Sequence, residues 1–170
     1  MTLRPAAASD APTIAAAQRA VAQTPGLLAS RPEEIDAAEV ARKIAALGEQ
    51  GGGIFLVAEE RGELVGHGLL QTYRLAVTAH IVELTLVAHA GHQGRGVGRQ
   101  IMRALIDWAR AQPAVEKIEL RVRASNERAI GLYRSLGFVE EGRFRRRIRL
   151  GPAAYIDDVA MALWVGAAEP

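Results

Sequence analysis

Residues 93–99 read Gln93-Gly94-Arg95-Gly96-Val97-Gly98-Arg99. The three glycines at alternate positions allow a turn with positive φ and let a ligand approach the main chain closely. If a helix begins within this stretch, several N–H groups without intrahelical partners converge on one point, and the helix dipole adds partial positive charge. We therefore predict an anion-binding site, and a phosphate group is the ligand that suits it.

The flanking sequence supplies the elements that such a loop requires. Residues 81–88 are apolar and β-branched over most of their length, which predicts a buried strand before the loop. After the loop, apolar side chains recur at helical spacing: Val97, Ile101, Leu105 and Trp108. The stretch lacks the Gly-Lys-Ser/Thr ending of a P-loop, and its glycine spacing is not that of a Rossmann turn. The alternative is a glycine-rich turn that binds nothing.

Composition limits the classes of protein to which the chain can belong. With 170 residues and no internal repeat or linker, we expect a single domain, residues 1–170, that buries about 70% of its unfolded surface. There is no cysteine, which excludes disulfides, thiolate metal sites and a cysteine nucleophile. His89 and His92 lie three apart in a loop without a carboxylate at ligand spacing, so we expect no metal site there.

The N-terminal sequence and the hydropathy bear on location. Residues 1–5 contain no apolar signal core, and no apolar run in the chain approaches the ~20 residues of a membrane span. We expect a cytoplasmic protein that has no membrane partner.

Basic residues are concentrated in one segment. The formal net charge is only +2, yet residues 142–149 hold five arginines. In an extended strand, four of them would share one face: Arg143, Arg145, Arg147 and Arg149. This face is either simply solvated or attracts an anionic ligand, such as a phosphorylated cofactor or a carboxylate substrate. Because Phe144 is the only aromatic residue in the segment and no nucleic-acid motif occurs, we expect no nucleic-acid partner.

The rest of the chain predicts an α+β fold. Ser9 is the expected N-cap of a helix that runs to about Gln23, and Pro32 begins a second helix that runs to about Leu47. A third helix follows the glycine loop, and Gly137 suits the C′ position of a short fourth one. Strands are expected at residues 2–4, 54–59, 64–70, 80–88, 115–122, 138–141, 146–150 and 155–164. This order predicts a mixed, mostly antiparallel sheet flanked by helices.

Two segments of this order resemble the GNAT acyltransferase superfamily. Residues 93–98 match its Arg/Gln-x-x-Gly-x-Gly/Ala pyrophosphate loop. Residues 126–138, Asn-Glu-Arg-Ala-Ile-Gly-Leu-Tyr-Arg-Ser-Leu-Gly-Phe, match its Asn-x-x-Ala-x-x-Leu-Tyr-x-x-x-Gly-Phe segment. The resemblance covers nearly the whole chain and implies an N-acetyltransferase that uses acetyl-CoA and no metal. It also implies a strand that splays from its neighbour at a bulge to open the acyl-CoA cleft, and it is compatible with a homodimer.

The resemblance assigns residues to the cofactor. The main chain of Leu86, Val87 and Ala88 would pair with the pantetheine arm, and Asn126 would contact the cofactor. The pyrophosphate would lie on the glycine loop, which comprises Gln93, Gly94, Arg95, Gly96, Val97, Gly98 and Arg99. Tyr133 would lie near the sulfur, where a general acid can give a proton to the departing thiolate. From the residue pattern alone, Tyr133 can equally be a half-buried tyrosine that packs with its helix.

Glu83 is the candidate general base. It lies on the strand that leads to the cofactor loop, and its carboxylate can accept the proton of the attacking amine directly or through water. The alternatives are a carboxylate that projects into solvent and one that pairs with a neighbouring arginine. His80, at the start of the same strand, is the second candidate for the base.

The resemblance also bears on the acceptor. Residues 120–126 look like the corresponding segment of ribosomal-protein N-terminal acetyltransferases, but those carry a glutamate base where this chain has Arg121, and a guanidinium cannot replace it. Residues 80–83 and 151–161 look more like the branch that acylates free amino acids and related small amines. Three arginines are candidates to bind a substrate carboxylate: Arg121, Arg145 and Arg147.

We therefore expect direct acetyl transfer from acetyl-CoA to the primary amine of an amino acid or an amino-acid analogue. A second hypothesis is acetylation of protein or peptide amines, which an open cleft without a loop from residues 26–32 would favour. Two hypotheses without catalysis are a regulatory acyl-CoA-binding protein and a basic nucleic-acid-binding module.

Overall fold

The computed structural model describes residues 1–49 and 52–166, so residues 50–51 and 167–170 of the expected single domain lie outside it. The described elements are β1 (Thr2–Pro5), α1 (Ala11–Ala22), α2 (Ala37–Glu49), β2 (Gly53–Glu60), β3 (Glu63–Thr72), β4 (Ile81–Ala88), α3 (Val97–Arg110), β5 (Lys117–Arg123), α4 (Glu127–Ser135), β6 (Val139–Arg149) and β7 (Tyr155–Trp164). Short 3₁₀ helices lie at Ala8–Asp10, Pro32–Glu34 and Ala76–Thr78. None of the helices in this part of the chain is long and apolar enough to cross a membrane.

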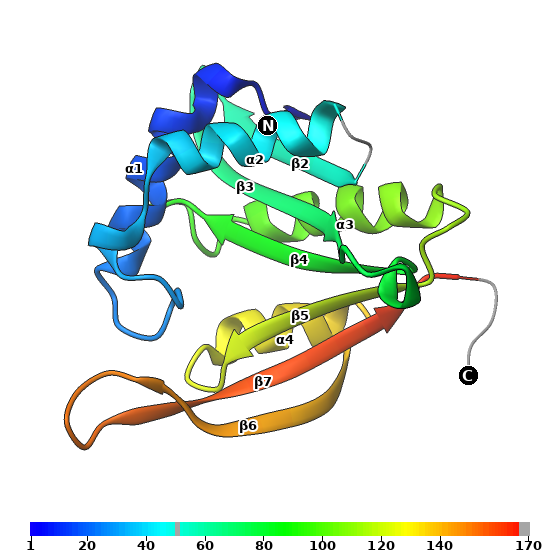
Figure 1. Cartoon of the computed structure of the whole chain (residues 1–170). Coiled ribbons are helices and arrows are strands. Elements are labelled where there is room, and N and C mark those ends of the chain that lie inside the picture. The colour runs from blue at the N-terminus through cyan, green and yellow to red at the C-terminus, as the bar shows by residue number, and fades with distance from the viewer. Residues whose placement is uncertain (50–51, 167–170) are drawn as a thin grey trace.

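The strands of the described residues form one mixed sheet in the order β1-β2-β3-β4-β5-β7-β6. β4 and β5 are parallel, and every other neighbouring pair is antiparallel. The last two strands form a hairpin at one end of the sheet (Figure 1). The α+β class and the mostly antiparallel sheet that the sequence predicts are confirmed.

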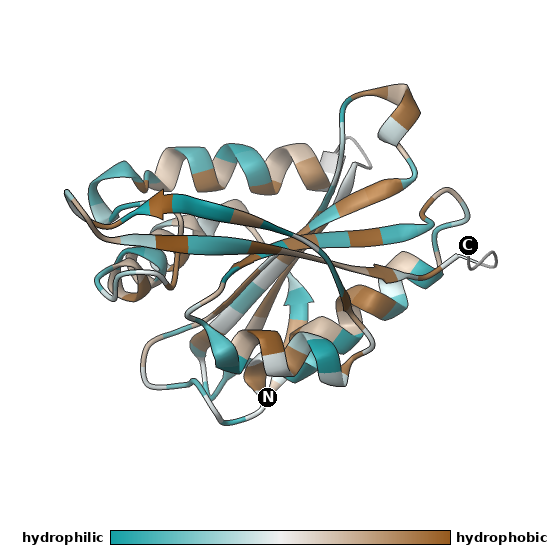
Figure 2. Ribbon diagram, turned by 90° about the horizontal axis from the view of Figure 1, so that it is seen from below, coloured by the Kyte–Doolittle hydropathy of each residue, from teal (hydrophilic) through white to brown (hydrophobic). Residues whose placement is uncertain are grey.

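Helices cover both faces of the sheet. Helices α1 and α2 pack on one face of β2 and β3, and α3 and α4 lie on the opposite face (Figure 1). Successive side chains of β2 point to opposite faces of the sheet, so both helix layers pack on this strand. Phe55 and Val57 pack toward α1 and α2, whereas Leu56 and Ala58 pack toward α3. Apolar and polar segments accordingly alternate along the helices and strands in Figure 2.

Two glycines of β3 bring α3 close to the sheet. A Cβ atom at Gly66 would come within 2.7 Å of the Val97 side chain, and one at Gly68 would come equally close to Ile101. Val97 is the first residue of α3, so this close packing fixes the height of the helix N-terminus above β3. The position of the glycine loop before α3 depends on that packing.

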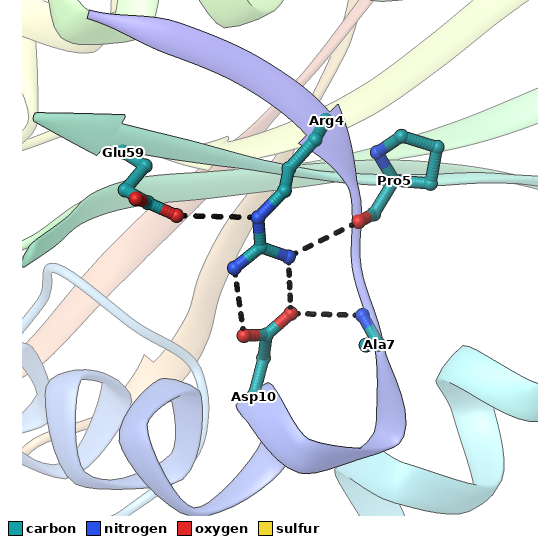
Figure 3. Close-up of polar contacts among 5 residues, drawn as sticks. All are labelled: Arg4, Pro5, Ala7, Asp10 and Glu59. Carbon is teal, nitrogen blue, oxygen red and sulfur yellow. Dashed lines mark hydrogen bonds and ion pairs between the residues drawn. The ribbon is translucent and has the colours of Figure 1, made fainter. Parts of the chain in front are cut away.

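The start of α1 differs from the expectation. The predicted N-cap at Ser9 is wrong, because Ser9 lies inside the 3₁₀ helix and Asp10 is the residue that precedes α1. Arg4 holds the Asp10 carboxylate through two hydrogen bonds of 2.7 and 3.0 Å, and donates a third, of 3.2 Å, to Glu59 (Figure 3). The Asp10 carboxylate also accepts the N–H of Ala7. The bond from Arg4 lowers the pKa of Asp10, against the opposing effect of burial.

The second helix also begins later than predicted. Pro32 starts a separate 3₁₀ turn, and α2 begins at Ala37. The break occurs at Ile35, whose backbone is extended and whose carbonyl accepts two hydrogen bonds from the Arg19 guanidinium. Asp36 then accepts the N–H of Ala38 at 3.0 Å and so caps α2.

The arginine-rich segment is one strand rather than the two expected at 138–141 and 146–150. Its register with β7 shifts twice, and Arg146 adopts a positive φ of 53° and donates its N–H to Asp157. The shift turns Arg147 toward Asp158, whereas Arg143 lies opposite Val159 on the other side of the sheet. The prediction that alternate arginines share one face is therefore wrong, because the bulge interrupts the alternation.

A buried chain of hydrogen bonds links α1, β3 and His89, the residue that follows β4. His89 Nδ1 donates to the Leu64 carbonyl at 2.7 Å, which leaves His89 Nε2 to accept from His67 Nδ1 at 2.9 Å. His67 Nε2 then accepts from the Gln18 amide at 3.1 Å. Both rings are neutral in this arrangement. Burial lowers the pKa of His67 to about 3 and also lowers that of His89.

We predict that this chain makes the fold sensitive to acid. An unfolded histidine takes up a proton near pH 6.5, whereas His67 stays neutral in the fold down to about pH 3, so stability is complete above 6.5 and is lost as the pH falls toward 3. Between pH 7 and pH 5 the free energy of unfolding should drop by roughly 2 kcal/mol for His67 alone. Urea titrations at several pH values measure this free energy of unfolding.

The matched variants are His67→Gln and His80→Gln. Loss of His67 should flatten the decline of stability between pH 7 and pH 5, since the titrating group is gone. His80, which is partly exposed, should leave the decline as it is in the wild type. An equal decline in the His67 variant would contradict the assignment.

Candidate active site

The site lies where β4 and β5 part. Their parallel pairing covers only Ile81–Glu83 and Lys117–Glu119, after which β4 continues beside β3 and β5 continues beside β7 (Figure 1). A cleft of about 1400 Å³ opens at this place. The β3–β4 register runs without a shift, so the bulge expected in the splayed strand is not found, although β4 and β5 do separate.

The glycine loop borders this cleft. Gly94 and Gly96 have φ values of 79° and 84°, and Gly96 is the N-cap of α3. The backbone N–H groups of the first turn of α3 therefore point out of the helix next to the cleft, as an anion site requires. Five residues of the predicted loop line the cleft: Gln93, Gly94, Gly96, Gly98 and Arg99.

Two predicted loop residues direct their side chains elsewhere. Arg95 pairs with Glu60 at 3.2 Å and contacts His92. Val97, the first residue of α3, points into the core between this helix and the sheet. The cleft does not include either side chain. Arg95 instead fastens the loop to the end of β2.

The second half of β4 presents a free edge to the cleft. Leu86, Val87 and Ala88 line it, and their β5 side has no strand partner among the described residues. Their opposite edge is paired with β3 up to Gly66. An extended ligand can therefore add to β4 as a further strand would.

Helix α4 contributes Asn126 and Tyr133 to the other side of the cleft. Asn126 is its N-cap, and the side-chain oxygen accepts the N–H of Ala129 at 3.1 Å. Tyr133 is only 7% exposed, and its ring centroid lies 5.8 Å from that of Phe138. Burial raises the pKa of Tyr133 to about 12, against the opposing charge of Arg123. The tyrosine is thus a protonated hydroxyl at neutral pH.

Glu83 lies at the point of divergence and pairs with an arginine. Its carboxylate lies 3.3 Å from the Arg121 guanidinium, and both residues line the cleft. The two side chains are 39% and 44% exposed, so water reaches both. His80 precedes β4, and its side chain is not part of the cleft.

The structure adds a buried ion pair that the sequence did not reveal. Arg123 donates to Asp158 at 2.8 Å, and the two residues face each other across β5 and β7. Arg147 approaches the second oxygen of Asp158 at 3.8 Å and also lines the cleft, whereas Arg145 does not. Two acidic residues at this end of the chain, Asp157 and Asp158, were visible in the sequence, but their partners depend on strand register.

The loop after α1 lines part of the cleft. Several of its residues line the cavity together with the start of α2: Thr24, Leu27, Leu28, Ala29, Ser30, Ile35, Asp36 and Val40. Among the described residues, no group of three or more His, Cys, Asp or Glu side chains is arranged to hold a metal ion.

Comparison with known proteins connects this geometry to a family. The chain is 36% identical over 100 residues to N-alpha-acetyltransferase RimI of Mycobacterium tuberculosis, which is 58% of this chain and 60% of that protein. It is 34% identical over 85 residues to L-amino acid N-acyltransferase MnaT of Escherichia coli, 49% of each chain. The matches thus span about half to 60% of the length of these relatives.

The fold is shared over a longer stretch. A phosphinothricin acetyltransferase from Sinorhizobium meliloti, solved in complex with acetyl-CoA, superimposes with a TM-score of 0.88 over 99% of this chain and 92% of that one, at 22% identity. Residues 22–138 match the model of the acetyltransferase (GNAT) family, and they include the glycine loop, the free edge of β4 and Tyr133. On this match and on the shared fold, the chain belongs to the GNAT family of acetyltransferases.

Proposed function

We propose that the protein transfers the acetyl group of acetyl-CoA to the primary amine of a small molecule, an amino acid or an amino-acid analogue. The observation that carries the proposal is the convergence of the glycine loop, the free edge of Leu86–Ala88 and the hydroxyl-bearing Tyr133 on one cleft. A diphosphate on the loop and a pantetheine arm along β4 would bring the thioester to α4. The Sinorhizobium neighbour, which shares the fold, was solved in complex with acetyl-CoA, and this is consistent with acetyl-CoA as the ligand of the cleft.

The reaction needs two proton transfers. The neutral amine attacks the thioester carbonyl, the new C–N bond forms and the C–S bond breaks. Glu83 would accept the amine proton, directly or through water, and Tyr133 would give its proton to the departing thiolate. With a pKa of about 12, Tyr133 is protonated at neutral pH, so the donor is present before each turnover. Since the chain has no cysteine, we propose direct transfer without a cysteine acyl-enzyme.

The acceptor end of the cleft supports a small substrate with a carboxylate. Leu27–Ser30 line the cleft, so it is not the open groove without this loop that a peptide substrate would favour. Among the three candidate arginines, Arg121 is engaged with Glu83, and Arg145 lies outside the cleft. Arg147 is thus our candidate to bind the substrate carboxylate.

Acetylation of a protein N-terminus is the second candidate, because RimI is among the relatives. Arg121 argues against it, since this arginine stands where the resemblance places a glutamate base. A regulatory acyl-CoA-binding protein without turnover is the non-enzymatic alternative.

The acceptor is tested by measuring free thiol release from acetyl-CoA with the twenty amino acids, polyamines and short peptides. We expect turnover with one or more free amino acids, and lower turnover with the corresponding α-amides, which lack the carboxylate. Arg147→Gln should raise KM for the acid about tenfold or more while leaving KM for the amide nearly unchanged. Arg149→Gln, a neighbouring arginine outside the cleft, is the control.

Turnover restricted to peptides would favour the N-terminal acetyltransferase. Binding of acetyl-CoA without turnover on any amine in the panel would favour the regulatory protein.

Tyr133→Phe tests the general acid. Loss of the proton donor should lower kcat by about 100-fold or more, while the Kd for acetyl-CoA changes little because the ring remains. Tyr155→Phe is the matched control, since Tyr155 lies under Arg146 and outside the cleft. Stopped-flow or steady-state thiol release gives kcat, and calorimetry gives Kd. Near-normal turnover would remove Tyr133 from the mechanism.

Glu83→Gln tests the base. If the carboxylate accepts the amine proton, the acidic limb of the pH profile of kcat/KM should disappear in the variant. Glu119→Gln is the matched control, because Glu119 is the register partner of Glu83 on β5 and does not line the main cleft. An unchanged acidic limb in the Glu83 variant would assign proton removal to another group or to bulk water.

A further inference from the structure

Arg128 is a cation that neither the loop motif nor the mechanism accounts for. It is the second residue of α4, and its side chain borders the cleft beside the glycine loop. Its guanidinium lies so close to Gly94 that a Cβ atom there would overlap Nη2, and the Cζ atom would be 3.1 Å away. Gly94 therefore leaves room for the Arg128 head group as well as providing the turn.

No acidic side chain among the described residues lies within ion-pair distance of this guanidinium. Among the described residues, Arg128 has neither an ion pair nor a side-chain hydrogen bond, although the other arginine of α4, Arg134, reaches Glu140 at 3.6 Å. A positive charge in the first turn of a helix also opposes the helix dipole. The loop beside Arg128 presents N–H donors, so the guanidinium and the loop repel each other unless an anion binds to both.

We infer that Arg128, whose guanidinium lies beside Gly94, binds the diphosphate of acetyl-CoA together with the N–H groups of the glycine loop. The inference deepens the proposed function and rests on it. A guanidinium suits the task because it offers paired donors in one plane to two phosphate oxygens. The contact to Gly94 favours the diphosphate over the 3′-phosphate, since the diphosphate is the group that the loop would hold.

The test compares three donors that differ in their phosphates. Acetyl-CoA has the diphosphate and the 3′-phosphate, acetyl-dephospho-CoA keeps only the diphosphate, and S-acetylpantetheine has neither. Arg128→Gln should weaken binding of the first two by the same factor, about tenfold or more, because each loses one charge-assisted contact. KM for S-acetylpantetheine should not change. Kd values come from calorimetry with the full chain.

Arg134→Gln is the matched control, because it removes the same charge from the same helix at a residue outside the cleft. It should leave all three donors at wild-type affinity, apart from a small general effect of net charge. Melting temperatures of both variants establish that the fold is retained, and Arg128→Lys should restore part of the affinity for the two nucleotides.

Three results would overturn the inference. A loss confined to acetyl-CoA would place Arg128 on the 3′-phosphate, and an equal loss with S-acetylpantetheine would mean an indirect effect on the cleft. Unchanged affinity for all three donors would mean that Arg128 contacts no phosphate. If the wild type itself does not bind acetyl-CoA, the proposed function fails, and the inference fails with it.

Discussion

The early end of the β4–β5 pairing is the constraint on which the site depends. After three residue pairs, β4 stays with β3 and β5 stays with β7, so the edge of Leu86–Ala88 faces the cleft without a strand partner among the described residues. Backbone N–H and C=O groups need hydrogen-bond partners, and an extended ligand can supply them here. Helices α3 and α4 flank the opening, and each brings one part of the site to it, the glycine loop and Tyr133 respectively.

The glycine loop is held in place by residues that do not line the cleft. Gly66 lets α3 approach β3 closely, which fixes the first turn of the helix. Arg95 joins the loop to Glu60 on its outer side, and His89, between β4 and the loop, is joined to the core through the imidazole of His67. The loop backbone is thus positioned before any ligand arrives, which lowers the ordering cost of binding a phosphate.

Charges in the cleft are divided between buried pairs and accessible groups. Arg123 and Asp158 are buried and satisfy each other, so their pair has a structural role next to Tyr133. Glu83 and Arg121 remain open to water at the centre of the cleft. Arg147 also lines the cleft, and it lies 3.8 Å from Asp158, farther than the 2.8 Å between Arg123 and Asp158. In the reaction that we propose, the accessible charges are the ones that would meet the substrate amine and its carboxylate.

The sequence by itself determined the order of the elements, the glycine loop before α3 and the short helix within residues 126–138, because periodicity, glycine spacing and helix signals are local properties. It did not determine contacts that depend on strand register. Arg123 meets Asp158 and Glu83 meets Arg121 only because residues 35 and 38 apart lie side by side in the sheet. Likewise, Arg147 enters the cleft because a bulge interrupts the alternation. Register is set by tertiary packing, and a shift in it turns a side chain to the other face.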